Sequence, residues 1–403
     1  MNNSGKTPVT PASLRGLPIG IWALGFGSLF MDTSSELIHS LLPMFMTTVL
    51  GASMVTVGIV EGVAEATAAI TRVFSGALSD YLGKRKFLLV LGYALSAFTK
   101  PVFPLAGSIG WVFAARFVDR IGKGIRGAPR DALVADIAPP HLRGAAYGLR
   151  QALDSVGAFL GPLLAIVFMI WFANDISAVM WIAVVPAFIA VILLMVHVRE
   201  PERGSAATGD SLWKLTDARR LPARFWMVVL LGGVFTLARF SEAFLLLRAQ
   251  DTGLALSFVP LVMIVMNVAY ALFAYPAGIA ADRMSVRTLL LFGLLFLIAA
   301  DLALAFATSA LLVLTGSVLW GLHMALTQGL LSKLVADSAP EQLRGTAFGL
   351  FHLISGVALL LASVIAGAMW QVYGAPATFF AGAIFAAVTA CGLLVYRTES
   401  RAA

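Results

Sequence analysis

Long apolar segments alternate with short polar ones along almost the whole chain. Each apolar segment is about twenty residues or longer, which is the length that an α-helix needs to cross the core of a bilayer. One longer polar segment, 199–224, interrupts the pattern near the middle of the chain. We therefore predict twelve membrane-spanning helices, at 19–48, 54–78, 86–106, 109–127, 144–172, 177–198, 225–248, 256–280, 287–307, 310–334, 345–370 and 376–395.

Two short motifs occur twice, at nearly the same spacing. The segment 76–85 returns as 278–287, 202 residues later (278 − 76), and the segment 135–149 returns as 336–350, 201 residues later (336 − 135). Two unrelated motifs that share a spacing of half the chain indicate a tandem duplication. We predict two six-helix domains, 1–198 and 225–403, joined by a cytoplasmic linker at 199–224. Duplicated halves in a membrane chain are typical of transporters with a site between the halves.

The composition supports a membrane protein and excludes several other classes. Hydrophobic residues make up 60% of the chain and charged residues 12%, against about 45–50% and 25% in soluble domains. The formal net charge of +7 does not indicate nucleic-acid binding, because the excess Lys and Arg lie in short connections after even-numbered spans. By the positive-inside rule both termini are cytoplasmic, with Arg248 as the one exception. Cys391 is the only cysteine, so we expect no disulfide and no metal site.

The duplicated loop motif resembles that of the major facilitator superfamily. The family pattern is Gly, three residues, Asp, two residues, Gly, one residue, Arg, and the second copy has Ser285 in place of the second glycine. The resemblance implies an all-α fold of two pseudo-symmetric six-helix bundles, alternating-access transport, a monomer in the plasma (bacterial inner) membrane, and no cofactor. It also implies that the loops latch the cytoplasmic side; the alternative is that they only fix topology and packing. The motif residues are Gly76, Asp80, Gly83, Arg85, Gly278, Asp282 and Arg287.

The fifth span carries a second resemblance, to the antiporter motif of the drug:proton antiporter branches. Gly148, Gly157, Gly161 and Pro162 match it, but Ala165-Ile166 stands where the motif has a final glycine pair. Glycines four residues apart give a smooth helix face for close packing. The resemblance implies export.

Ionisable residues inside the spans are candidates for ion coupling, because burying them in a membrane is costly. Asp32 and Glu36 lie four residues apart on the first span and therefore share one helix face. A carboxyl group in a low-dielectric cavity can titrate near neutral pH, so we predict coupling to protons, with Na⁺ as the other possible ion. The alternative is that these acids form static ion pairs, including one between Arg239 and Asp32 or Glu36. The candidates are Asp32, Glu36, Glu65, Lys100, Arg239 and Glu242.

Other charges in the spans suggest a structural role. We predict a cytoplasmic charge network around Asp80; the alternative is a site for an anionic substrate. Asp301, His323 and His352 are isolated in their spans and are expected to be hydrogen-bonded packing residues. The network residues are Arg116, Asp119, Arg120, Arg150 and Asp154.

The sequence therefore predicts a secondary active transporter that exports a small amphipathic or drug-like molecule in exchange for protons. Aromatic and methionine side chains are expected to contact the apolar part of the substrate. Uptake of a nutrient, siderophore or metal complex remains the alternative. A membrane enzyme or a sensor is disfavoured, since no catalytic motif is present; the glycine-rich segment 122–127 lacks the Lys and Ser/Thr of a phosphate loop. The expected apolar contacts are Phe30, Met31, Phe240 and Phe244.

Overall fold

The computed structural model describes residues 16–200, 219–327, 329–340 and 343–395. In these residues the regular elements are helices, and nine of them are long and apolar enough to cross a membrane. Three expected spans are not among these nine. The first and the fourth carry buried charged residues, and the seventh is broken into two shorter helices. The predicted all-α fold of twelve spans in two six-helix bundles is confirmed.

The N-terminal half contains the first six spans, of which the third and the sixth are each built from two helices. Its elements are α1 (Ile19–Met44) with a π-helical turn η2 (Phe45–Val49), α2 (Met54–Leu82), α3 (Arg85–Thr99) and α4 (Val102–Leu105), α5 (Ile109–Ile137), η3 (Pro140–Leu142), α6 (Arg143–Trp171), α7 (Ile176–Ile182) and α8 (Val184–His197).

The C-terminal half repeats this arrangement, with breaks in its first and fourth spans. Its elements are α9 (Ala223–Leu237) and α10 (Ala243–Asp251), η5 (Leu256–Phe258), α11 (Leu261–Arg283), α12 (Val286–Ala305), α13 (Ala310–Thr327) and α14 (Leu330–Ser338), α15 (Arg344–Tyr373) and α16 (Ala375–Val395). Most of the expected linker between α8 and α9 lies outside the described residues.

The two copies of the loop motif end their helices differently, which explains the missing glycine. Gly83 caps α2 in the left-handed conformation, with φ of +61°, where a side chain would be strained. At the equivalent place α11 ends without a left-handed residue, and Ser285 instead accepts a hydrogen bond from the Thr288 backbone at the start of α12. The second loop therefore needs an N-cap residue and not a glycine.

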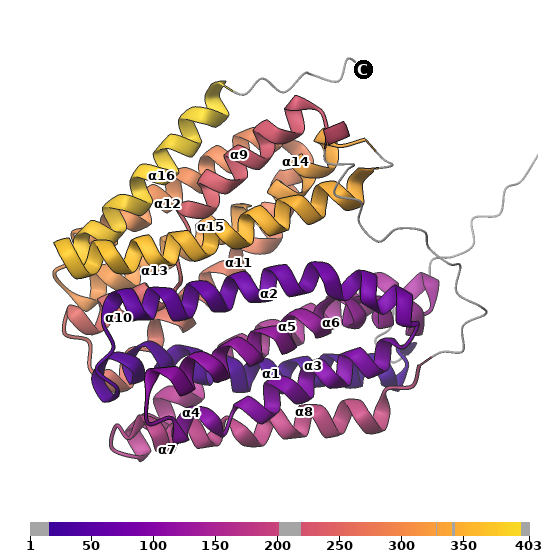
Figure 1. The fold of residues 1–403 in the computed structure, drawn as a ribbon, viewed down its shortest axis with the longest axis horizontal. Helices are drawn as coiled ribbons and strands as arrows, with labels where there is room; N and C mark the ends of the chain where they lie inside the picture. The colour runs from indigo at the N-terminus through magenta and orange to yellow at the C-terminus, as the bar shows by residue number, and fades with distance from the viewer. Residues whose placement is uncertain (1–15, 201–218, 328, 341–342, 396–403) are drawn as a thin grey trace, which may run out of the picture.

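The two halves are in close contact at one end of the bundle. We call this the closed end, and we call the other end, where 82–85 and 283–286 lie, the motif end. At the closed end the Met54 amide donates to the Gln371 Oε1 at 3.1 Å, and the Ser257 hydroxyl donates to the Asn174 Oδ1 at 2.6 Å. An added Cβ at Gly58 would collide with the Ser363 carbonyl. In Figure 1 the two halves diverge from here toward the motif end.

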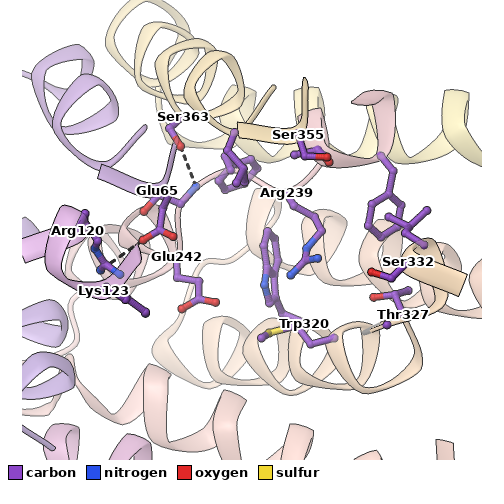
Figure 2. Close-up of a pocket in the computed structure, with 18 of the residues that line it drawn as sticks. Glu65, Arg120, Lys123, Arg239, Glu242, Trp320, Thr327, Ser332, Ser355 and Ser363 are labelled. Carbon is purple, nitrogen blue, oxygen red and sulfur yellow. Dashed lines mark hydrogen bonds and ion pairs between the residues drawn. The ribbon is translucent and has the colours of Figure 1, made fainter. Parts of the chain in front are cut away.

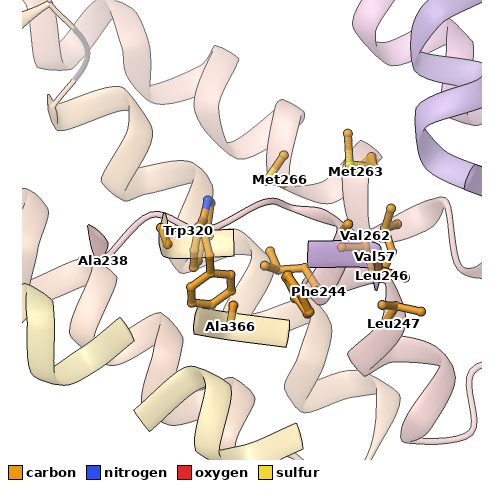
Figure 3. Packing of buried hydrophobic residues seen from close by; sticks show 14 of the residues in the cluster. Val57, Ala238, Phe244, Leu246, Leu247, Val262, Met263, Met266, Trp320 and Ala366 are labelled. Carbon is orange, nitrogen blue, oxygen red and sulfur yellow. The ribbon is translucent and has the colours of Figure 1, made fainter. Parts of the chain in front are cut away.

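The apolar core follows the same division. One cluster of buried side chains spans both halves, with Val57 of α2 beside Phe244, Leu246 and Met263 of the C-terminal half (Figure 3). A second cluster, which includes Leu24, belongs to the N-terminal half alone. Shared burial of apolar surface therefore holds the halves together on the closed side.

Arg248, the exception to the positive-inside rule, has a structural partner. Its guanidinium donates to the backbone carbonyls of Leu304, Ala305 and Ala307 at the end of α12 and pairs with Asp251. A cation at a helix C-terminus satisfies carbonyls that have no partner within the helix. The position of Arg248 follows from this capping and carries no information about membrane orientation.

Candidate functional site

A cavity of about 490 Å³ lies between the two halves (Figure 2). The N-terminal half contributes acidic and basic side chains from α1, α2 and α5, and the C-terminal half contributes the segment between α9 and α10, the break between α13 and α14, and α15. A second cavity of about 470 Å³ shares Glu36, Glu65 and Lys123 with the first and reaches toward the motif end as far as Arg72. The two form one continuous space that extends from the middle of the bundle toward the motif end.

Both breaks in the C-terminal half line this space. The non-helical segment 238–242 places Arg239 and Glu242 at the cavity, and its Ser241 amide is held by the Ser363 hydroxyl at 3.2 Å. The break between α13 and α14 contributes Gly329, which has a φ of +80°. Interrupted helices in equivalent regions of membrane transporters usually line the substrate site. Neither break was predicted from the sequence, although Gly329 was a signal for the second.

Two acids of α2 face two arginines of α5, one helical turn apart on each. Arg116 donates to Glu61 at 2.8 Å with both side chains buried, and Arg120 lies 3.3 Å from Glu65. His39 on α1 joins this ladder to the cavity, because its ring nitrogens lie 3.3 Å from Glu36 and 3.7 Å from Glu61. His39 and Glu61 were not among the site residues predicted from the sequence. The matched four-residue spacings on α2 and α5 were the signal that could have identified the ladder.

Lys100 does not line the cavity as expected, and the expected ion pair of Arg239 is wrong. Lys100 pairs with Asp119 at 3.0 Å and donates to the Ser35 hydroxyl, and it is buried away from the cavity. Arg239 forms no ion pair with Asp32 or Glu36; its guanidinium lies over the Phe235 ring, 5.8 Å from the centroid. Each of the two cations contacts a residue of its own half, Asp119 in one case and Phe235 in the other.

The expected charge network is divided into two groups. Arg116, Asp119 and Arg120 make the mid-membrane pairs with Glu61, Lys100 and Glu65. Arg150 and Asp154 form an ion pair with each other at 2.9 Å. They belong to a separate group on the motif side, which also includes Arg130, Asp131 and Arg72. Asp32 lies at the edge of this second group, 3.9 Å from Arg126. The side chain of Asp80, the expected centre, lies outside the described residues.

The loop motif makes its described contacts within each half. Arg85 pairs with Asp136 at 2.7 Å, which joins the two repeated motifs of the N-terminal half, and Arg287 donates to the Leu394 carbonyl at 2.5 Å. An added Cβ at Gly278 would meet no described atom within 4 Å, and one at Gly76 would meet only Ala128, at 3.6 Å. The close helix approach expected at these glycines is therefore absent in this conformation. The side chain of Asp282 lies outside the described residues.

The antiporter-like motif packs α6 directly against α1. An added Cβ at Gly157 would lie 2.7 Å from the Leu29 carbonyl, and one at Gly161 would lie 2.8 Å from the Glu36 Cβ. An added Cβ at Gly148 would meet nothing within 4 Å, and Pro162 is buried inside the helix. Two of the three motif glycines thus set the position of the helix face that carries Asp32 and Glu36.

The apolar wall of the cavity differs from the expected one. Phe240 lines the cavity, but Phe244 and Met31 are fully buried in the two packing cores and Phe30 packs against the second of them. The other aromatic side chains that line the cavity are Phe235, Trp320 and Phe351. In the described part of the chain, no group of three or more His, Cys, Asp or Glu side chains is arranged to hold a metal ion.

Comparison with known proteins identifies the family. The model of the Major Facilitator Superfamily matches residues 24–248 and 242–403. An uncharacterised MFS-type transporter of Methanocaldococcus jannaschii is 33% identical over 389 residues, which cover 94% of this chain and 95% of the relative. The chain also shares its fold with two solved transporters. One is the nucleoside transporter NupG, with a TM-score of 0.75 and 13% identity over 94% of this chain and 99% of that one. The other is a D-xylose-proton symporter, with a TM-score of 0.74 and 18% identity over 94% of this chain and 98% of that one. With a matching family model over both halves and a full-length relative, the chain belongs to the major facilitator superfamily.

Proposed function

We propose that this MFS-type membrane transporter works by alternating access and exports a small amphipathic molecule in exchange for protons. In this proposal the motif end faces the cytoplasm, both termini are cytoplasmic, and the chain acts as a monomer in the plasma (bacterial inner) membrane. The central cavity then receives its substrate from the cytoplasm in the conformation described above.

The observation that carries the proposal is the composition of the cavity wall. Aromatic side chains on the C-terminal half offer a flat apolar surface, and carboxylates stand opposite and beside it. Among these, Glu36 is hydrogen-bonded to His39 and Glu65 is paired with Arg120. The Glu242 side chain has no hydrogen bond or ion pair within the described residues, although it lines the same cavity. Such a wall suits a ligand with an apolar body and a cationic group.

Glu242 is the proposed site of proton exchange. Because no described side chain forms an ion pair with it, the carboxylate can be neutralised either by a proton or by the cationic group of a substrate, but not by both at once. Substrate binding from the motif end would then release the proton, and proton binding from the other side would release the substrate. Competition for one carboxylate couples the two movements in opposite directions.

The arrangement of the two halves supports alternating access. They share an apolar core at the closed end, and the cavity extends from their centre toward the motif end. Alternating access requires that contacts of this kind break at one end and form at the other. The unpacked glycines Gly76 and Gly278 are available for close approach when the motif end closes.

Proton-coupled uptake of a polar solute is a second candidate, and a specific observation favours it. Lys123 and Arg239 line the cavity from opposite halves, and neither has a carboxylate within ion-pair distance among the described residues. Two free cations suit a substrate that carries an anionic group. A protonated Glu242 would not repel such a substrate, so the proton and the anion would travel together.

The two candidates are separated by transport in proteoliposomes under an imposed pH gradient. The probes are ethidium, an amphipathic cation, and benzoate, an amphipathic anion. Export by exchange predicts that ethidium accumulates in the more acidic compartment and that Glu242→Gln removes the dependence on the gradient. Glu65→Gln, at a carboxylate already paired with Arg120, is the matched control and should retain it. Benzoate accumulation with the protons would favour uptake, and ethidium movement that ignores the gradient would overturn the proton exchange.

A further inference from the structure

One carboxyl group of the C-terminal half lies outside the cavity and outside all the ion pairs described above. Asp301, on α12, has no exposed surface, and neither of its side-chain oxygens has a hydrogen-bond partner among the described residues. The expectation that it is a hydrogen-bonded packing residue is therefore wrong. An isolated ionised carboxylate in such surroundings is so costly that the neutral, protonated form replaces it.

The surroundings of Asp301 place it directly behind the wall of the cavity. An added Cβ at Gly382 of α16 would lie 2.7 Å from the Asp301 Oδ2 and 2.9 Å from a ring carbon of Phe240. The carboxyl group and the Phe240 ring therefore converge at the same point on α16. Phe240 lines the cavity as well and packs against Trp320 and Phe379, with ring centroids 5.5 and 5.7 Å apart. Phe240 is therefore a neighbour of both the carboxyl group and the cavity.

No neighbouring charge neutralises this carboxyl group. Arg248, which bonds the Leu304 carbonyl about one turn further along α12, is engaged by backbone carbonyls and by Asp251. Ionisable groups on the packed elements form no hydrogen bond or ion pair with Asp301. Those with described side chains are Tyr270, Tyr275 and Arg283 on α11, Arg287 on α12, His323 on α13, Lys333 and Asp337 on α14, Cys391 on α16, and Arg239, Glu242, Arg248 and Asp251 on 238–251.

We propose that Asp301 is a second proton-binding site of the transporter, separate from Glu242, and that Phe240 controls its access to the cavity. Phe240 lies in the non-helical segment 238–242, which has fewer backbone constraints than a continuous helix. A rearrangement of this segment would move the ring from Gly382 and expose the carboxyl group to cavity water. In the conformation described here the ring is in place and the proton stays bound.

Infrared spectroscopy of the reconstituted full chain tests the first part. A protonated carboxyl group gives a carbonyl stretching band that is separate from those of ionised carboxylates and of amides. We expect that Asp301→Asn, a substitution of nearly equal shape, removes one such band from the spectrum at neutral pH. Glu242→Gln is the control and should leave that band in place. If Asp301→Asn leaves all protonated-carboxyl bands unchanged, the proposal is overturned.

Exchange of the proton for deuterium tests the second part on the native carboxyl group. After transfer to D₂O the Asp301 band shifts at a rate set by water access. We expect Phe240→Ala to speed this shift by an order of magnitude or more, because removing the ring opens the site to the cavity. Phe351→Ala also removes an aromatic ring from the cavity wall and should leave the rate unchanged. Equal rates in the wild type and in Phe240→Ala would overturn the control by Phe240. The experiment needs no transported compound, so its outcome is independent of the direction and substrate proposed above.

Discussion

At the residue scale, the partner of each buried charge decides whether that charge can take part in transport. Glu61 and Arg116 are almost fully buried and lie 2.8 Å apart, so each neutralises the other. Glu242 faces the cavity without such a partner. A fixed pair holds helices in place, whereas an unpaired carboxylate can exchange its proton for a ligand.

The Glu61–Arg116 pair gives a stability prediction. Glu61→Gln leaves the Arg116 charge buried without a counterion, and losing one partner of a buried pair costs about 3–5 kcal/mol. We expect a large decrease in the thermal unfolding temperature of the purified protein in detergent.

Glu65→Gln is the matched control for this prediction. The Glu65 side chain is 35% exposed, against 0% for Glu61, so water already solvates this carboxylate in part and its pair with Arg120 contributes less to stability. The decrease should be several times smaller. If the two variants unfold at the same temperature, the buried pair has no special role in stability.

At the element scale, helix breaks and glycine faces position the site. The break between α9 and α10 places Arg239 and Glu242 at the cavity, and the glycines of α6 hold α1 behind Asp32 and Glu36. The antiporter-like motif therefore acts on the position of Asp32 and Glu36 through packing within the N-terminal half.

Gly161→Ala tests this role of α6. The added methyl group would lie 2.7 Å from the Thr33 carbonyl and 2.8 Å from the Glu36 Cβ, so α1 and α6 must separate. Overpacking of this kind costs about 1–3 kcal/mol, and we expect a lower unfolding temperature together with reduced transport.

Gly148→Ala, on the same helix, provides the comparison. Its methyl group would meet no described atom within 4 Å, and replacing a helical glycine by alanine in open space stabilises by about 0.4–1 kcal/mol. We expect an unchanged or slightly higher unfolding temperature. A loss of stability at Gly148 equal to that at Gly161 would contradict the packing explanation.

At the scale of the whole molecule, contacts at the closed end join the two halves. Hydrogen bonds between Ser257 and Asn174 and between Met54 and Gln371 connect the halves there, over a shared apolar core. Alternating access requires these contacts to separate once in each transport cycle.

A disulfide across this contact should lock the transporter. In a Cys391→Ser background, which removes the only native cysteine, Asn174→Cys together with Ser257→Cys places two thiols where the side chains now lie 2.6 Å apart. We expect oxidation to stop transport in proteoliposomes and a reductant to restore it. Each single cysteine variant should transport normally under both conditions. Full activity of the completely cross-linked protein would show that the closed end does not open.

Much of the molecule follows from sequence patterns alone. Spans of about twenty apolar residues must cross the membrane as helices, since their backbone groups find no other partners in lipid. The duplicated motifs at 76–85 and 278–287 then indicate two related bundles. The acids and bases of the spans stand out for the same reason, because lipid makes every charge costly.

Only the tertiary structure decided which of these charges meet. The side of each helix that faces the cavity depends on packing between different helices, such as Lys100 beside α3 with Asp119 of α5, or α6 with α1. The break at 238–242 carries no proline or glycine signal, and the contact of Phe240 with the surroundings of Asp301 exists only once α9, α12 and α16 are assembled. Hydrophobicity is a property of each segment by itself, so the sequence determined the spans. Ion pairing and enclosure are properties of several segments together, so they were decided by the fold.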